Sequence, residues 1–223
     1  MIKLTKAPPT QEIIELLNKE KAKHSGTYTH TIIIDAIKKD FKNKCYLCEQ
    51  HELTSINIEH FIPHRGDKEL KFDYYNLFFS CPHCNNLKSD KYDNLLNVLT
   101  DDVENLISYH IKHLTKSSSV DIKAIGDSDK INLTVELLDK IYNGSTDLKI
   151  AESTNLKNLL VKELEMFTRH LRILEDDFAD EDDKLYAKKE LNKMLRPEAA
   201  FTAFKRQIIK DIPYFKEQFS QYF

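Results

Sequence analysis

The four cysteines of the chain form two Cys-x-x-Cys pairs, and their spacing points directly to metal chemistry. They are Cys45, Cys48, Cys81 and Cys84. A two-residue spacer lets a tight turn aim both sulfurs of a pair at one ion, and thiolates suit zinc. We expect one structural zinc ion, because four thiolates fill its coordination shell. Four buried free thiols, or a redox pair, are the alternative interpretation.

The insert between the two pairs carries polar side chains at suggestive positions. Glu59 and His60 are adjacent in SINIEHFIP, which partly alternates polar and apolar residues as a half-buried strand does. YNLFFSC is a second short strand candidate, and its Asn76 lies 16 residues after His60. Asn85 and Lys88 follow the second cysteine pair, in a stretch that looks helical or turn-like.

These motifs, EHFIP, YNL and CPHCNNLK, resemble those of the HNH endonucleases, or ββα-metal nucleases, in order and spacing. The family pattern is roughly Asp/Glu-His-Ile-x-Pro, then Asn-Leu, then Cys-x-x-Cys-Asn/His-x-x-Lys. The chain departs from it at Phe61, where isoleucine is frequent, and at Glu59, where the commoner aspartate would reach less far. The resemblance implies a ββα-metal core that hydrolyses phosphodiester bonds.

The chemistry of that reaction and the resemblance together assign roles to the polar residues. Hydrolysis needs an activated water and a cation that neutralises charge on the phosphate. His60 is the candidate general base, because an imidazole can take a proton near neutral pH. Glu59 and Asn85 offer oxygen ligands for Mg²⁺ or Mn²⁺. The resemblance makes Asn76 the residue that fixes the loop of the base, and Lys88, one turn after Asn85, is expected to reach a phosphate.

The other polar side chains around the insert each have two interpretations. Arg65, Lys68 and Lys71 form either a solvated loop or the local cations that a nuclease with a net charge of −3 needs. His64 lies either near the phosphate or at the surface, and we count it with Arg65 among the candidate substrate-binding residues. His83, inside CPHC, is expected to point to solvent or to backbone rather than to act in catalysis.

Composition and periodicity indicate an α+β fold that is mostly α. The chain has 223 residues, of which 41% are hydrophobic and 31% charged, with only 4 glycines, and this balance favours helices. We predict a ββα-metal core with a four-cysteine zinc site, flanked by helices on both sides. The predicted parts are an N-terminal helical segment (1–40), the HNH nuclease domain (41–114), a linker or surface loop (115–132) and a C-terminal helical bundle (133–223).

Several helices have visible start signals or an apolar face. Thr10 is expected to cap a helix that ends by Gly26, and Pro197 is expected to open another, since proline is tolerated in a first turn. A long helix carries an apolar stripe that predicts core packing, with a partner-binding face as the alternative. The stripe consists of Leu156, Leu160, Leu164, Phe167, Leu171 and Leu174.

Location and partners follow from weaker signals. No run approaches the roughly 18 to 20 apolar residues of a membrane span, and the first residues lack an apolar signal core, so we expect a cytoplasmic protein. The layout resembles the nuclease subunits of Septu-type anti-phage defence systems, which implies an ABC-type ATPase partner that docks near 156–174 or 197–223. The alternatives are a defence nuclease directed at RNA or tRNA, and a zinc-stabilised nucleic-acid-binding module whose nuclease site has decayed.

Overall fold

The computed structural model describes residues 1–115, 118–144 and 147–223, and it confirms a mostly helical α+β fold. The described residues include two small antiparallel sheets, β1 with β2 and β3 with β4. In chain order the elements are α1 (Gln11–Ala22), α2 (Thr31–Asp40), β1 (Asn57–His60), α3 (Lys68–Phe72), η1 (Tyr74–Asn76), β2 (Leu77–Ser80), α4 (Pro82–Lys88), α5 (Val103–Leu106), β3 (Ile107–Ile111), β4 (Val120–Ala124), α6 (Asp129–Asn143), α7 (Asp147–Glu175), α8 (Glu181–Met194), α9 (Thr202–Asp211), α10 (Pro213–Gln218) and η2 (Ser220–Tyr222).

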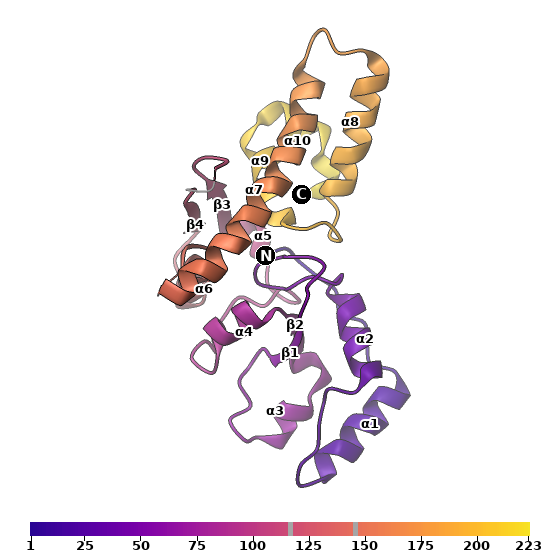
Figure 1. The fold of residues 1–223 in the computed structure, drawn as a ribbon. Helices are drawn as coiled ribbons and strands as arrows, with labels where there is room; N and C mark the ends of the chain where they lie inside the picture. The colour runs from indigo at the N-terminus through magenta and orange to yellow at the C-terminus, as the bar shows by residue number, and fades with distance from the viewer. Residues whose placement is uncertain (116–117, 145–146) are drawn as a thin grey trace.

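Figure 1 shows an elongated arrangement with the β1–β2 hairpin and α4 between two helical ends. Helices α1, α2 and α3 lie together at one end, and the hairpin of α7 and α8 forms the other. Helix α7 is the long connector, because its first turns lie beside α6 and its last turns pair with α8. The site therefore has an N-terminal layer on one side and the C-terminal helices on the other.

Both strands predicted for the cysteine-bounded insert are confirmed as the antiparallel β1–β2 hairpin. Glu59 pairs with Phe78, and His60 pairs with Leu77. Helix α4 begins directly after β2, with Pro82 in its first turn and the Cys81 sulfur accepting a hydrogen bond from the Cys84 backbone N–H at 3.4 Å. Proline suits that position because a first-turn N–H has no partner inside the helix. The hairpin and α4 form the ββα unit that the resemblance implies.

The N-terminal segment forms the expected helix and packs onto the insert. The Thr10 side chain caps α1 by accepting from the Ile13 N–H at 3.4 Å. The helix ends at Ala22, because the next residue adopts an extended backbone before Gly26 is reached. Upstream of α1, the Lys6 ammonium donates to the carbonyls of Tyr74 and Leu77, which join η1 to β2. The start of the chain is thus tied to the connection between the two strands of the site.

The apolar stripe of α7 is core, as its periodicity predicts. Leu156, Leu160 and Leu164 are at most 3% exposed and belong to the main core, which includes the β1–β2 hairpin. Phe167 and Leu171 belong to a second core cluster, formed with α8, α9 and α10. The alternative of a partner-binding stripe is therefore wrong, because the chain's own helices cover these side chains.

Two expectations about local structure differ from the fold. Residues 120–124, inside the predicted linker, form β4 and pair with β3, because Val120 and Ile122 are buried. The part of that linker at 116–117 lies outside the described residues. Pro197 does not open a helix, and α9 begins only at Thr202. The turn before α9 is held from a distance, since the buried Lys44 ammonium donates to the Ala199 carbonyl at 2.8 Å. Among the described residues no helix is long and apolar enough to cross a membrane.

Candidate active site and metal centre

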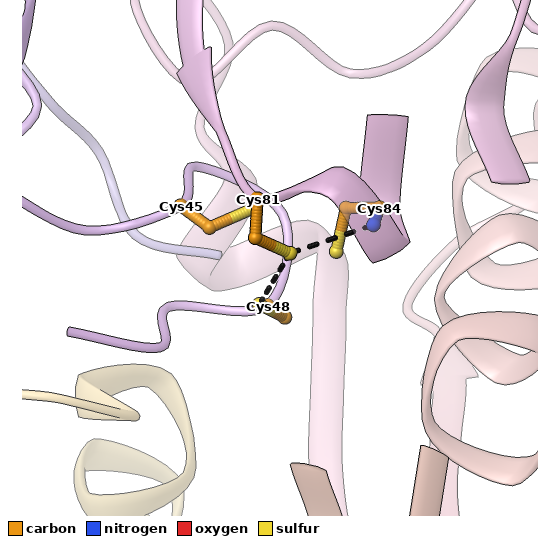
Figure 2. A group of neighbouring side chains, drawn as sticks. All are labelled: Cys45, Cys48, Cys81 and Cys84. Atoms are coloured by element: carbon orange, nitrogen blue, oxygen red, sulfur yellow. Dashed lines mark hydrogen bonds between the residues drawn. The ribbon is translucent and has the colours of Figure 1, made fainter. Parts of the chain in front are cut away.

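The four cysteines converge as their spacing predicts. Figure 2 shows Cys45 and Cys48 approaching from the loop after α2, and Cys81 and Cys84 from the end of β2 and the start of α4. All four are buried, none forms a disulfide, and their sulfurs lie within 4.8 Å of one another. The sulfurs of Cys48 and Cys81 are 3.9 Å apart. A zinc ion with Zn–S distances of about 2.3 Å would separate its sulfurs by roughly 3.8 Å, so the cluster is positioned to bind a metal.

The electrostatics of the cluster also favour a cation. Burial raises the pKa of the Cys48 and Cys84 thiols. Hydrogen bonds within the cluster, led by the one with Cys45, lower the pKa of Cys81. Several thiolates side by side in an apolar interior repel one another and lack hydration, so they need a bound cation.

His60 lies at the end of β1, and its contacts define one tautomer. Its Nε2 atom is 3.0 Å from the backbone carbonyl of Lys71. A carbonyl oxygen only accepts hydrogen bonds, so Nε2 must carry the proton in the neutral ring. Nδ1 therefore keeps a lone pair, which is the form that a general base needs. Partial burial lowers the pKa of His60, which favours this neutral form.

Glu59, next to His60, is buried beside the Lys88 ammonium. The residue is 5% exposed, and Oε2 lies 3.8 Å from the Lys88 ammonium. Oε1 is buried and has no hydrogen-bond partner among the described residues. Burial raises the pKa of Glu59 to about 7, against the opposing effects of the Lys88 charge and of the Tyr46 hydroxyl. An unpartnered carboxylate oxygen fits a hard divalent cation, and Mg²⁺ prefers such oxygen ligands.

Lys88 makes an internal contact in addition to the ion pair with Glu59. Its ammonium donates to the His60 carbonyl at 2.8 Å, and the residue is only 1% exposed. Lys88, the last residue of α4, thus connects this helix to the end of β1. A phosphate contact by Lys88 stays a prediction, and in this conformation the ammonium is already engaged by the two residues of the Glu-His pair.

Asn76 fixes the loop between His60 and α3 with its side-chain amide. Its Oδ1 accepts from the Ile62 N–H at 2.7 Å, and its Nδ2 donates to the carbonyls of Ile62 at 2.9 Å and Leu70 at 3.0 Å. The Phe61 N–H adds a bond to the Asn76 carbonyl at 2.9 Å. These are backbone contacts of the kind that the resemblance implies for Asn76.

A cleft of about 480 Å³ brings the other predicted site residues together. Its lining includes Glu59, His60, His64, Arg65, Asn85 and Lys88. The His64 ring packs edge-on against His60, with ring centroids 4.6 Å apart. Arg65 donates to the Asp90 carbonyl and to the Asp93 carboxylate, both at 2.9 Å. Arg65 therefore braces the cleft rim in this conformation, and a contact between Arg65 and substrate stays a prediction.

Lys68, Lys71 and His83 form hydrogen bonds to segments that are distant in sequence. The ammonium of Lys68 donates to the carbonyl of Lys23 at 3.0 Å, and that of Lys71 donates to the carbonyl of Gly26 at 3.0 Å. His83 bonds the Ile141 carbonyl at 2.9 Å, which confirms its predicted contact with backbone. Its other ring nitrogen lies 2.6 Å from the Glu152 carboxylate, so the cysteine-bearing turn is linked to α6 and α7.

The comparison with known families agrees with this geometry. Residues 45–91 match the family model described as HNH endonuclease, which covers both cysteine pairs and the polar residues between them. The segment 45–91 is an HNH endonuclease domain, and this family consists of nucleases that use divalent metals. No curated protein and no solved structure matches the chain.

Sequence reasoning missed Tyr28, which lines the same cleft from the loop between α1 and α2. Its ring packs edge-on against His60, with centroids 4.6 Å apart and planes at 74°. Tyr28 lies outside the matched segment 45–91, and no motif in the sequence relates it to His60. Only the packing of the N-terminal layer onto α3 brings the two rings together.

Proposed function

We propose that this chain is a metal-dependent endonuclease that hydrolyses phosphodiester bonds in DNA. The observation that carries the proposal is the contact between His60 Nε2 and the Lys71 carbonyl, from which the tautomer follows. Nε2 donates to the Lys71 carbonyl, so the basic Nδ1 keeps its lone pair in a ring that lines the cleft with Glu59 and Asn85. A nuclease needs this arrangement, since a base and cation ligands must reach one phosphate.

In this mechanism His60 takes a proton from the attacking water through Nδ1. The ring then carries a positive charge, and its Nε2–H bond to the Lys71 carbonyl becomes charge-assisted and stronger. Asn76 keeps Lys71 and His60 at a fixed separation, because it holds the loop between them. Mg²⁺ or Mn²⁺, held by Glu59 and Asn85, would supply charge neutralisation at the phosphate. Zinc in the four-cysteine cluster would hold the start of α4, which carries Asn85.

Cleavage of supercoiled plasmid by the purified chain, with Mg²⁺ or Mn²⁺, tests the proposal. His60→Ala should abolish nicking and leave the circular dichroism spectrum unchanged. His113→Ala is the matched control, because His113 is exposed and lies outside the cleft. Cutting by His60→Ala at the wild-type rate would contradict the assigned role.

Giving the purified chain plasmid and tRNA in parallel decides between DNA and RNA as the substrate. Wild-type protein that cleaves tRNA and spares plasmid would reassign the substrate to RNA, because a base and one metal serve both polymers. Wild-type protein that binds nucleic acid without cleaving it would indicate a decayed site. We choose DNA because of the resemblance to defence nucleases. We favour a working site over a decayed one because Glu59, His60 and Asn85 all line the cleft.

We also propose a role in bacterial anti-phage defence with an ABC-type ATPase partner, in the cytoplasm. The support is the order of segments, in which an HNH domain is followed by a long helical region. The buried stripe of α7 cannot be the docking face, which leaves the exposed residues of 197–223, such as Tyr214 at 55% and Phe223 at 46% exposure. Coexpression with an ATPase encoded beside the gene should give a complex that comigrates in gel filtration, and Tyr214→Asp should weaken it. A neighbouring ATPase that does not comigrate would contradict the partner.

A further inference from the structure

The loop that carries Tyr28 is tied firmly to the element that holds His60. Lys71 contacts both segments. Its carbonyl accepts from His60 Nε2, and its ammonium donates to the Gly26 carbonyl at 3.0 Å. The Lys68 ammonium adds bonds to the carbonyls of Lys21 at 3.2 Å and Lys23 at 3.0 Å. Two lysines on one face of α3 therefore hold the end of α1 and the loop that follows it.

The loop is also fixed from within by a buried carboxylate. Glu20 is 3% exposed, and it accepts from the Thr27 N–H at 3.0 Å and from the Lys23 ammonium at 2.5 Å. Gly26 lies against the Glu20 carbonyl so closely that a Cβ there would sit 1.9 Å from that oxygen. No side chain other than that of glycine fits this approach. The position of Tyr28, two residues further on, is thus set by a preorganised loop.

Tyr28 uses this position to contact the catalytic imidazole. The rings of Tyr28 and His64 each pack edge-on against the His60 ring, both with centroids 4.6 Å away. Edge-to-face contacts between aromatic rings are directional and favour one relative orientation. Within the described part of the chain the imidazole makes one hydrogen bond, to the Lys71 carbonyl, and that bond alone leaves the ring free to tilt about it. The two ring contacts remove that freedom.

We propose that Tyr28 is a positioning residue of the nuclease site, and that its ring holds the His60 imidazole with Nδ1 directed into the cleft. The proposal rests on the proposed function. It extends the active site beyond the HNH segment, because the N-terminal layer supplies one wall of the base's pocket. The aromatic ring of Tyr28 makes the contact and the hydroxyl does not, so phenylalanine at this position should keep the function.

Kinetics with the full chain test the proposal. Tyr28→Ala should lower kcat for plasmid nicking roughly threefold to tenfold, the range expected for an edge-to-face contact, and should leave KM near the wild-type value. Tyr28→Phe should restore kcat to within about twofold of wild type. The matched control is Tyr186→Ala, because Tyr186 also packs edge-on against a histidine, His170, but does so on α8 outside the cleft.

A spectroscopic measurement separates positioning from a loss of stability. In histidine-labelled full-length protein, the nuclear Overhauser effects between the rings of His60 and His64, identified with His60→Gln, should weaken in Tyr28→Ala and keep their intensity in Tyr28→Phe. An unchanged kcat in Tyr28→Ala, or an equal loss in Tyr28→Phe, would overturn the positioning role while the proposed function stands. No cleavage of DNA or RNA by the wild type would overturn both.

Discussion

The substitution Asn76→Asp gives the most quantitative test of how the site is held together. Asn76 is 4% exposed and makes three side-chain hydrogen bonds to backbone. Aspartate has the same shape and keeps the bond that Oδ1 accepts from the Ile62 N–H. In place of Nδ2, which donates to the carbonyls of Ile62 and Leu70, aspartate has a second carboxylate oxygen. Three hydrogen-bond acceptors would then face one another with no proton to share.

The expected loss follows from those two bonds. Each contributes about 1 kcal/mol net, and leaving buried acceptors unsatisfied adds about 1–3 kcal/mol more. We therefore expect the free energy of unfolding to fall by about 3–5 kcal/mol, a large fraction of the ~5–15 kcal/mol of a typical domain. Because the released loop joins His60 to Lys71, we also expect kcat to fall at least about tenfold at temperatures where the variant stays folded.

Urea unfolding followed by circular dichroism measures the first effect, and single-turnover cleavage measures the second. A lower midpoint with an unchanged slope would report a loss of stability in the folded state. Asn18→Asp is the control, since Asn18 is exposed on α1 and should change stability by less than about 0.5 kcal/mol. If Asn76→Asp matched this control in both assays, the loop would not depend on the amide, and our account of how His60 is held would be wrong.

Two further predictions concern the metals. Elemental analysis should find about one zinc per chain, and Cys84→Ser should lose that zinc and unfold at a lower urea concentration; an intact fold without metal would contradict the cluster's structural role. Because burial raises the pKa of Glu59 to about 7, Mn²⁺ must displace a proton below that pH. Apparent Mn²⁺ affinity in calorimetry should therefore be flat above about pH 7 and fall up to about tenfold per unit below it. The Glu59→Gln variant should bind Mn²⁺ more weakly than wild type at every pH, and its affinity should not fall below about pH 7. Equal Mn²⁺ affinity of the wild type at pH 8 and pH 6 would contradict the role of the Glu59 carboxyl as a ligand.

The sequence determined the features that depend on short spacings. Two Cys-x-x-Cys pairs suffice to predict a metal cluster, because a turn of fixed length aims both sulfurs of a pair at one point. The alternation in SINIEHFIP and the cap at Thr10 likewise predicted β1 and the start of α1, since both are local properties of the backbone. The periodic leucines of α7 predicted a buried face for the same reason.

Only the tertiary structure decided which groups those elements meet. The turn before α9 is bound by a lysine that is distant in sequence, and β4 pairs with β3, a strand that its own residues do not specify. The tautomer of His60, the inward turn of Lys88 and the contact with Tyr28 all arise where separate segments pack against one another. Hydrogen bonds and ring contacts between such segments leave no periodic trace in the sequence, because their partners are set by the fold as a whole.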